Sequence, residues 1–534
     1  MRAATAQTDS PAATPTATAT RPASGTARSG RLLTWGLPLA LLALHVVVQL
    51  LVRPFPRWFD ALRVMELARQ FPNLDLHFPY SAGPASWHAL RIGSLVPERA
   101  FQDVAGYGQV AFYAFPFAMG IVLVLATFWL GRMLFGPAPA ALATLIVVLQ
   151  PILVRTTHNN TSWQLLPDIP AAALFTTGLA LLVAAGRRTA AGAEGRWLLV
   201  AAGACFGWQY LVRETAVFLF PVALVALLLC RVPWRRWWLV AVPMLVALGV
   251  EFVWAMHLYG DPLARWTVAS GHRYPGLEGG TRWHAAASFW RVLQHNPGAS
   301  VTLVMAVATV LGAAVTRRRG LLLCAVWFLA LWVPLTLLGG VIDPRHVSLR
   351  VDSPRYWVPL LPALALGTAG VLAVLAGRRA SVPRLGLAAA LAAVVVVVYG
   401  VADVRYIQQA GRGADEAGWT DARWSALRSW LHDHEREVPT VASDGRTAST
   451  LDLMYRYAPI GGDVEWHGRV AVLHRARRRV RQSRPVDTNG AALLWSRYTS
   501  VAPPRADGWR LAWRSDNGAL AVYLPRPAHA AAGQ

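Results

Sequence analysis

Residues 109–134 read QVAFYAFPFAMGIVLVLATFWLGRML, an apolar run whose one charged residue, Arg132, lies close to its end. An α-helix rises about 1.5 Å per residue, so a run of this length crosses a hydrocarbon core about 30 Å thick. Ten further apolar runs are spread along the chain, at residues 32–52, 138–154, 169–185, 197–212, 215–230, 238–258, 300–316, 320–342, 357–376 and 385–402. The sequence therefore predicts an all-α polytopic membrane protein with about eleven transmembrane helices.

The composition agrees with a membrane protein. Of 534 residues, 55% are hydrophobic and 15% are charged, and the mean hydropathy is +0.37. The formal net charge is +23, and all 51 basic residues are arginine, as expected of a GC-rich genome. The arginines gather at the ends of apolar runs, where they orient helices in the membrane. We therefore expect no nucleic-acid partner, and membrane lipid as the surroundings.

The arginines also predict the orientation of the chain. Alternate short loops carry them, and such loops face the cytoplasm. The arginines in these loops are Arg132, Arg187, Arg188, Arg196, Arg231, Arg235, Arg236, Arg317, Arg318, Arg319, Arg378, Arg379 and Arg384. This places the N-terminus in the cytoplasm, where residues 1–30, rich in Ala, Thr, Pro and Ser, form a disordered tail. Residues 31–402 form the transmembrane domain, and the tail from 403 lies outside.

Residues 403–534 have a different pattern from the rest of the chain. Strand-like segments at 509–515 and 519–524 flank Asp516-Asn517-Gly518, a hairpin signal. Upstream, apolar residues recur at helical spacing, at Trp424, Leu427, Trp430 and Leu431. We expect a small extracytoplasmic α/β domain.

The first outer loop, residues 53–108, contains the strongest catalytic candidate. Asp60 follows the first apolar run directly and lies beside Trp58 and Phe59. Apolar neighbours raise the pKa of a carboxyl group and suit it to act as a base. The alternative is a solvated loop carboxylate. Next come Leu62, Met65, Leu67 and Ala68, which indicate an amphipathic helix lying on the membrane.

The second outer loop offers two further candidates. Asp168 begins the next helix from outside, either as an N-terminal cap or as a functional carboxylate at the mouth of the bundle. His158, with Asn159 and Asn160, either binds sugar hydroxyls or only hydrates the loop.

Two arginines complete the candidate set. Arg213-Glu214 interrupts an apolar stretch at an outer turn, either as a mutually neutralising pair or with Arg213 free to contact a phosphate. Arg355-Tyr356 opens the tenth apolar run and suits an interfacial anchor and a lipid-phosphate site equally well. The three cysteines lie in or beside apolar runs without a CxxC motif, so neither a disulfide nor a zinc site is indicated. Nucleotide-binding, zinc-protease and serine-hydrolase motifs are also absent from suitable elements.

Taken in order, these segments resemble the polyprenyl-phosphate-dependent glycosyltransferases of the membrane-embedded C-type (GT-C) fold, near the protein O-mannosyltransferases and aminoarabinose transferases. Asp60 falls at the family's acidic motif, and Leu211–Thr215 resembles its arginine-containing outer turn. The other matching segments are Leu166-Pro167-Asp168-Ile169-Pro170, Tyr259-Gly260-Asp261-Pro262 and Arg355-Tyr356 with Pro359-Leu360-Leu361-Pro362. One departure is Ala61, where the family often has a second acid.

The resemblance implies sugar transfer from a polyprenyl-phosphate donor to a glycan, lipid or protein acceptor at the outer face of the membrane. Asp60 would be the catalytic base, and Asp168, His158, Arg213, Arg355 and Tyr356 would bind substrate. No cofactor is assigned; a divalent metal stays open, although Ala61 weakens the case for one held by an acid pair. Two other functions stay open: a transporter or lipid flippase, and a non-catalytic scaffold that presents the outer domain.

Overall fold

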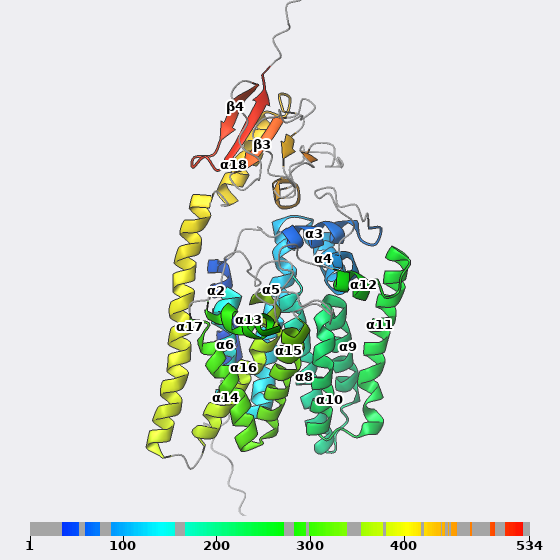
Figure 1. Cartoon of the computed structure of the whole chain (residues 1–534), viewed down its shortest axis with the longest axis vertical. Helices are drawn as coiled ribbons and strands as arrows, with labels where there is room; N and C mark the ends of the chain where they lie inside the picture. The colour runs from blue at the N-terminus through cyan, green and yellow to red at the C-terminus, as the bar shows by residue number, and fades with distance from the viewer. Residues whose placement is uncertain are drawn as a thin grey trace, which may run out of the picture.

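The structure is a computed structural model, in which the described residues make up an apolar helical bundle and a small sheet domain at one end of it (Figure 1). These residues are 35–52, 59–74, 87–154, 166–271, 282–294, 298–338, 354–377, 381–417, 421–438, 441–443, 447, 450–455, 470–472, 492–496 and 508–526.

An apolar helix is found at each of the eleven runs identified in the sequence. They are α2 (Leu37–Val52), α5 (Gln109–Phe135), α6 (Pro137–Val148) with α7 (Pro151–Val154), α8 (Asp168–Ala190), α9 (Arg196–Val212), η3 (Glu214–Leu219) with α10 (Phe220–Leu229), η4 (Trp234–Arg236) with α11 (Trp238–Tyr259), α14 (Val301–Thr316), α15 (Arg319–Leu338), η6 (Pro354–Leu360) with α16 (Leu361–Leu375), and α17 (Val382–Ala417). In the described part of the chain, six helical segments are long and apolar enough to cross a membrane, and four shorter ones are apolar. The predicted polytopic fold is confirmed.

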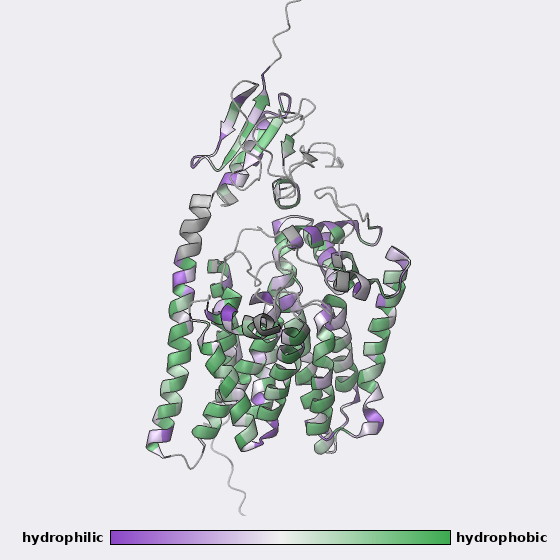
Figure 2. Ribbon diagram, viewed as in Figure 1, coloured by the Kyte–Doolittle hydropathy of each residue, from purple (hydrophilic) through white to green (hydrophobic). Residues whose placement is uncertain are grey.

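Apolar side chains hold the bundle together and also cover it. Figure 2 shows green, apolar residues along the membrane helices and purple, polar residues mainly at their ends. Trp327 and Trp357 are fully buried, and the Trp327 indole donates a hydrogen bond to the Pro359 carbonyl at 3.1 Å. Small residues allow close helix packing: a Cβ at Gly203 of α9 would collide with the Val240 backbone of α11.

Most of the short helices lie at the end of the bundle that faces the sheet domain (Figure 1). The first outer loop contributes three of them, and two more follow the α11 helix. They are α3 (Phe59–Gln70), η2 (Trp87–Leu90), α4 (Ile92–Ala105), α12 (Ala264–Gly271) and α13 (Arg282–Gln294). The amphipathic helix expected after Asp60 is therefore present as α3, and its apolar face is buried, with Leu62, Met65 and Ala68 fully covered.

The sheet domain contains the predicted helix and hairpin. Its elements are α18 (Asp421–Asp433), β1 (Val441–Ser443), η7 (Thr450–Met454), β2 (Val470–Val472), β3 (Ala492–Ser496), β4 (Trp509–Arg514) and β5 (Leu520–Pro525). The strand order is β2-β1-β3-β5-β4; β1 pairs in parallel with β2 and β3, whereas β5 is antiparallel to β3 and β4. At the hairpin turn Gly518 has φ +67°, which glycine adopts without strain.

The sheet domain packs onto α3. One hydrophobic cluster joins residues of α3 and α5 to α18, η7 and the strands, including Leu62, Trp424, Leu451 and Leu520. The α17 helix runs unbroken from the bundle to Ala417, so the domain boundary placed at 403 falls inside this helix. Helix α3, which carries Asp60, is therefore fixed between the membrane helices and the sheet domain.

Candidate active site

Asp60 lies in the first turn of α3, at the end of the bundle below the sheet domain. One carboxylate oxygen, Oδ2, is 3.5 Å from Nη1 of Arg355, and the other, Oδ1, is 3.5 Å from Nε2 of His88. The Asp60 side chain is 26% exposed, whereas His88 is 1% exposed. The structure thus brings two of the predicted site residues together, although 295 positions separate them in the sequence.

His88 reaches Asp60 from η2 and is held from its other side by Arg91. The Nη1 atom of Arg91 is 3.3 Å from Nδ1 of His88. Arginine is only a donor, so Nδ1 is the acceptor and the neutral ring carries its proton on Nε2. Burial lowers the pKa of His88; the Asp60 carboxylate opposes this shift and Arg91 adds to it. His88 is therefore a neutral donor aimed at Asp60.

Arg91 in turn ion-pairs with Glu214 at the start of η3. Its Nη2 atom lies 3.1 and 3.2 Å from the two carboxylate oxygens of Glu214. Burial lowers the pKa of Arg91, and the Glu214 carboxylate opposes that shift. The chain of contacts Asp60–His88–Arg91–Glu214 ties the first outer loop to the turn between α9 and α10.

Arg213 pairs with a different carboxylate, that of Asp168 at the start of α8. Both side chains are buried, at 4% and 1% exposure. The adjacent charges of Arg213 and Glu214 stabilise each other, and each residue also forms an ion pair with a residue from another outer segment. The Arg213 guanidinium also lies 4.8 Å from the centre of the Tyr356 ring, and that of Arg355 lies 5.6 Å from it.

Arg265 of α12 binds the backbone next to Arg91 and Arg213. Its guanidinium pairs with Glu251 of α11 at 2.8 Å. It also donates hydrogen bonds to three backbone carbonyl groups: Tyr210 at 2.5 Å, Leu90 at 2.7 Å and Leu211 at 3.1 Å. Leu90 immediately precedes Arg91, and Tyr210 and Leu211 lie three and two residues before Arg213. Arg265 thus fixes the backbone at both arginines.

The remaining candidates are placed as follows. His158 lies outside the described residues. Ala61, at the position of the second acid in the resembling family, is fully buried. Among the described residues no group of three His, Cys, Asp or Glu side chains is arranged to hold a metal ion. Asp60 stands between a histidine and an arginine, so the residues described around it do not provide the ligands of a metal site.

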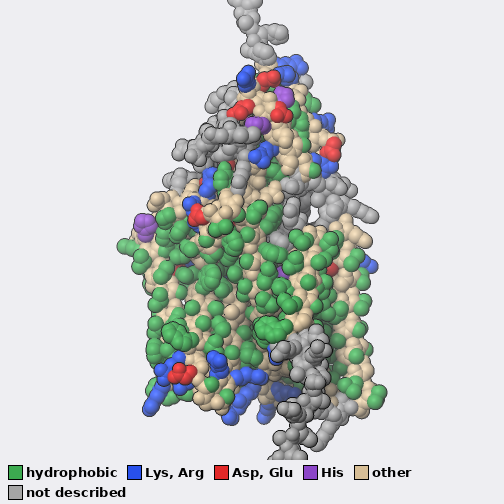
Figure 3. Space-filling view, turned by 180° about the vertical axis from the view of Figure 1, so that it is seen from behind, with side chains coloured by type: hydrophobic (Ala, Val, Ile, Leu, Met, Phe, Trp, Pro, Cys, Tyr) green, Lys and Arg blue, Asp and Glu red, His purple; other side chains and the backbone are tan. Residues whose placement is uncertain are grey.

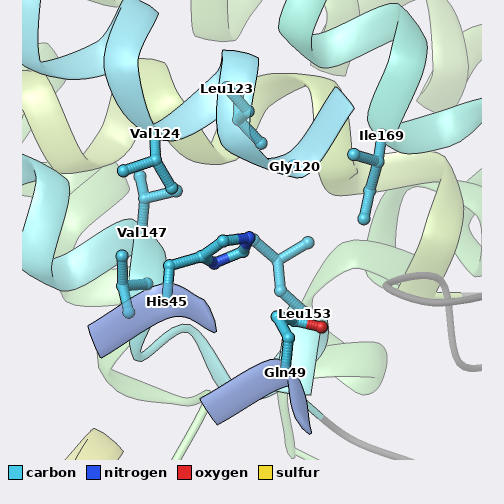
Figure 4. Close-up of a pocket in the computed structure, with 9 residues that line it drawn as sticks. His45, Gln49, Gly120, Leu123, Val124, Val147, Leu153 and Ile169 are labelled. Atoms are coloured by element: carbon cyan, nitrogen blue, oxygen red, sulfur yellow. The ribbon is translucent and has the colours of Figure 1, made fainter. Parts of the chain in front are cut away.

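A small pocket lies inside the bundle, next to the start of α8 (Figure 4). His45 and Gln49 of α2 line it among apolar side chains that include Leu123 and Ile169. Its free space holds about one water molecule, which is too little for a prenyl unit. The pocket is therefore not a lipid groove.

Comparisons with known proteins bear on the fold that carries these residues. Residues 98–259 match the family model of dolichyl-phosphate-mannose-protein mannosyltransferases. ArnT from Cupriavidus metallidurans in the apo state superimposes with a TM-score of 0.57 at 17% identity, covering 93% of this chain and 98% of that chain. The chain has the ArnT fold. The same protein bound to undecaprenyl phosphate gives a TM-score of 0.58 at 18% identity, covering 91% and 98% of the two chains.

Archaeal oligosaccharyltransferase AglB from Archaeoglobus fulgidus is more distant, with a TM-score of 0.46 at 14% identity over 81% of this chain and 62% of that chain. No curated protein sequence matches. The family match and the ArnT fold confirm the resemblance inferred from the sequence motifs. The family match includes Asp168 and Arg213 but begins after Asp60 and ends before Arg355.

On the ArnT fold, the residues that sequence reasoning missed come mostly from the first outer loop. His88 and Arg91 are the clearest examples. Both stand in a long loop with several charged residues, and nothing local distinguishes them. Arg91 is held in place beside His88 by its ion pair with Glu214, which is 123 positions away in the sequence. The available signal was Glu214 itself, a half-buried acid in an apolar stretch that needs a cation as partner.

The neutral state of His88 predicts a pH dependence of stability. Because burial keeps the His88 pKa below 6.5, the unfolded chain takes up a proton below that pH and the folded chain does not. The free energy of unfolding should therefore fall below about pH 6.5, by up to about 1.4 kcal/mol per pH unit for this histidine. We expect the thermal midpoint of His88→Gln in detergent to fall less than that of the wild type between pH 7 and 5.

The control for this experiment is His257→Gln, which removes an exposed histidine of α11. Its midpoint should follow the wild-type pH profile. Superimposable profiles for wild type and His88→Gln would show that His88 is not held neutral.

Proposed function

We propose that the protein is a membrane glycosyltransferase that moves a sugar from a polyprenyl-phosphate donor to an acceptor hydroxyl. The observation that carries this proposal is the placement of Asp60 between His88 and Arg355. A base and a phosphate-binding cation stand together at the end of an apolar bundle, below a polar domain. That is where a lipid-linked sugar and a water-soluble acceptor can meet.

The charges around Asp60 suit a singly charged phosphodiester. The carboxylates of the connected cluster are Asp60, Asp168, Glu214 and Glu251, and the arginines are Arg63, Arg91, Arg213, Arg265 and Arg355. Counted over the described residues, five arginines and four carboxylates give this cluster one net positive charge when His88 is neutral. A sugar joined to a polyprenyl phosphate carries one negative charge at its phosphate. The site can thus accept the donor without leaving a large excess charge of either sign.

In the proposed reaction Asp60 takes the proton of the acceptor hydroxyl while its oxygen forms a bond to the anomeric carbon. The bond between that carbon and the phosphate oxygen breaks, and the electron pair leaves with the polyprenyl phosphate. Arg355 lies beside Asp60 and stabilises the charge that grows on this leaving group. His88 holds the carboxylate from the opposite side, and the buried Arg213–Asp168 pair fixes Tyr356 behind Arg355.

The proposal extends to orientation and substrates. The arginine-rich loops would face the cytoplasm, and the sheet domain the outside. The donor would carry a hexose or a pentose, and the acceptor hydroxyl would belong to a glycan, a lipid or a protein. Arg355 would meet the charge of the phosphate, whether or not a divalent metal also takes part. A transporter is less well supported, because Asp60, Asp168 and Glu214 each lie in the first turn of a helix and not in the middle of a membrane span.

The donor class can be tested with purified protein in detergent. We expect turnover with an undecaprenyl-phosphate hexose or pentose, measured as release of undecaprenyl phosphate in the presence of a hydroxyl acceptor. Nucleotide sugars should react at least about 100-fold more slowly, since the described part of the chain has no nucleotide-binding loop. The matched control is Asp60→Asn with the same donors. Efficient use of a nucleotide sugar without a lipid intermediate, or no turnover with any lipid donor, would contradict the proposal.

A further inference from the structure

Two arginines adopt a backbone conformation that arginine normally avoids. Arg231 has φ +54° and Arg317 has φ +51°, and they are the only non-glycine residues with positive φ in the part of the chain that the structure describes. Each follows the last turn of an apolar helix, α10 or α14. Left-handed backbone at a residue with a Cβ is strained.

The local motifs show that glycine would fit both positions. At the end of α10, Arg231 N–H donates to the Leu228 carbonyl and Val232 N–H to the Leu227 carbonyl, both at 3.0 Å. This is a Schellman motif, in which the Arg231 position is usually glycine. At the end of α14, Arg317 N–H donates to the Ala313 carbonyl at 2.9 Å, as in the simpler left-handed cap.

The same chain uses glycine for this purpose elsewhere. Helix α11 ends in the simpler cap at Gly260, with φ +66° and its N–H 2.9 Å from the Met256 carbonyl. Gly260 lies at the end of the bundle near the sheet domain, whereas α10 and α14 end at the opposite end (Figure 1). Arginine therefore replaces glycine in these caps at the end far from the candidate active site.

Attraction to the helix C-terminus does not by itself explain this choice. A cation in the last helical turn gains the same attraction without left-handed backbone. Helix α8 does this with Arg187 and Arg188. A left-handed position is therefore not needed to place a cation near the end of a helix.

Other arginines come close to the same place. Gly186 packs on Cys230, so that an added Cβ would lie 2.6 Å from the Cys230 Cβ. Helix α10, which ends beside Cys230, packs against α8, with Arg187 in its last turn, and against α15, which begins at Arg319. Arg231 is the direct neighbour of Cys230. Figure 3 shows arginine side chains gathered at this end of the apolar belt.

We propose that Arg187, Arg231, Arg317 and Arg319 bind the phosphate headgroup of an anionic phospholipid. All four side chains are exposed, and each lies at or just beyond the end of an apolar helix. A planar guanidinium matches a phosphate through paired hydrogen bonds. Trp234 of η4, which is 72% exposed, follows Arg231 closely and suits the headgroup level of a membrane. Lipid tails would lie against the apolar helices that end here.

Substitution by glycine separates this role from a structural one. Arg231→Gly and Arg317→Gly remove the cation and relieve the backbone strain together. In nanodiscs of neutral phosphatidylcholine we expect the double variant to be as thermally stable as the wild type, or more stable. With phosphatidylglycerol we expect the apparent affinity, from titration by native mass spectrometry, to fall about 5-fold per arginine and about 30-fold for both.

The matched control is Arg384→Gln. This variant removes an exposed arginine from the first turn of α17 and should keep wild-type affinity for phosphatidylglycerol. Unchanged phosphatidylglycerol affinity in the double variant would overturn the proposal. A loss of stability in neutral lipid of the same size as in anionic lipid would also overturn it, because the arginines would then serve only the fold. Equal stabilisation by inorganic phosphate in the absence of phosphatidylglycerol would assign the site to a free anion and not to a lipid.

Discussion

Replacing Asp60 by asparagine is expected to lower turnover by about 10²–10⁴-fold, the usual contribution of a general base. Asparagine keeps the shape of the side chain and can still contact His88, but its amide cannot take up a proton from the acceptor. A loss of this size corresponds to roughly 3–5 kcal/mol of activation free energy. Folding should be little affected, because the Asp60 side chain is partly exposed.

The control for Asp60→Asn is Asp516→Asn in the β4–β5 hairpin. Asp516 is also paired with an arginine, Arg423, at 2.5 Å, but it is 72% exposed and belongs to the sheet domain. Its substitution should leave turnover within about 2-fold of the wild type. Retention of the lipid donor by Asp60→Asn should be measured in the same samples. Near-normal turnover of Asp60→Asn would show that the base lies elsewhere.

Breaking the Asp168–Arg213 pair should have the largest effect on stability. Arg213→Gln leaves the Asp168 carboxylate buried without its cation, and removal of one partner of a buried pair typically costs about 3–5 kcal/mol. We expect Arg213→Gln to lower the thermal midpoint strongly and to reduce activity through loss of folded protein. The measurement is thermal unfolding of purified protein in detergent.

The double variant Asp168→Asn with Arg213→Gln provides the matched comparison. It replaces the buried charges by two amides that can bond to each other, so it should recover most of the lost stability. If the single and double variants are equally unstable, the stability lost in Arg213→Gln does not come from leaving the Asp168 carboxylate unpaired. If Arg213→Gln folds as stably as the wild type, the pair is not structural.

The sequence predicts much of the fold because a membrane helix is encoded locally. Each needs a run of apolar residues long enough to cross the hydrocarbon core, and residues 109–134 or 385–402 show this without any knowledge of their neighbours. The β4–β5 hairpin is also local, since Asp516-Asn517-Gly518 encodes the turn. The extent of α17 was harder to predict, because its last turns continue past the apolar run to Ala417.

The candidate site is only partly predictable for the opposite reason. Asp60, Arg213 and Arg355 stand out because each is a charge beside an apolar run. Their partners depend on tertiary packing: Arg213 meets Asp168, not the adjacent Glu214, and Asp60 meets His88 through the fold of a long loop. A one-dimensional pattern does not contain these choices.

The central claim, that the Asp60 carboxylate takes the acceptor's proton, is tested most directly with a nucleophile that needs no base. Azide is already ionised, so its attack on the anomeric carbon bypasses the proton transfer. Formation of the glycosyl azide from a polyprenyl-phosphate sugar should be measured for the wild type and Asp60→Asn. We predict that Asp60→Asn, slowed by about 10²–10⁴-fold with hydroxyl acceptors, forms glycosyl azide at a rate within about 10-fold of the wild type. An equal loss of about 10²–10⁴-fold with azide and with hydroxyl acceptors would contradict the assignment of Asp60 as the base.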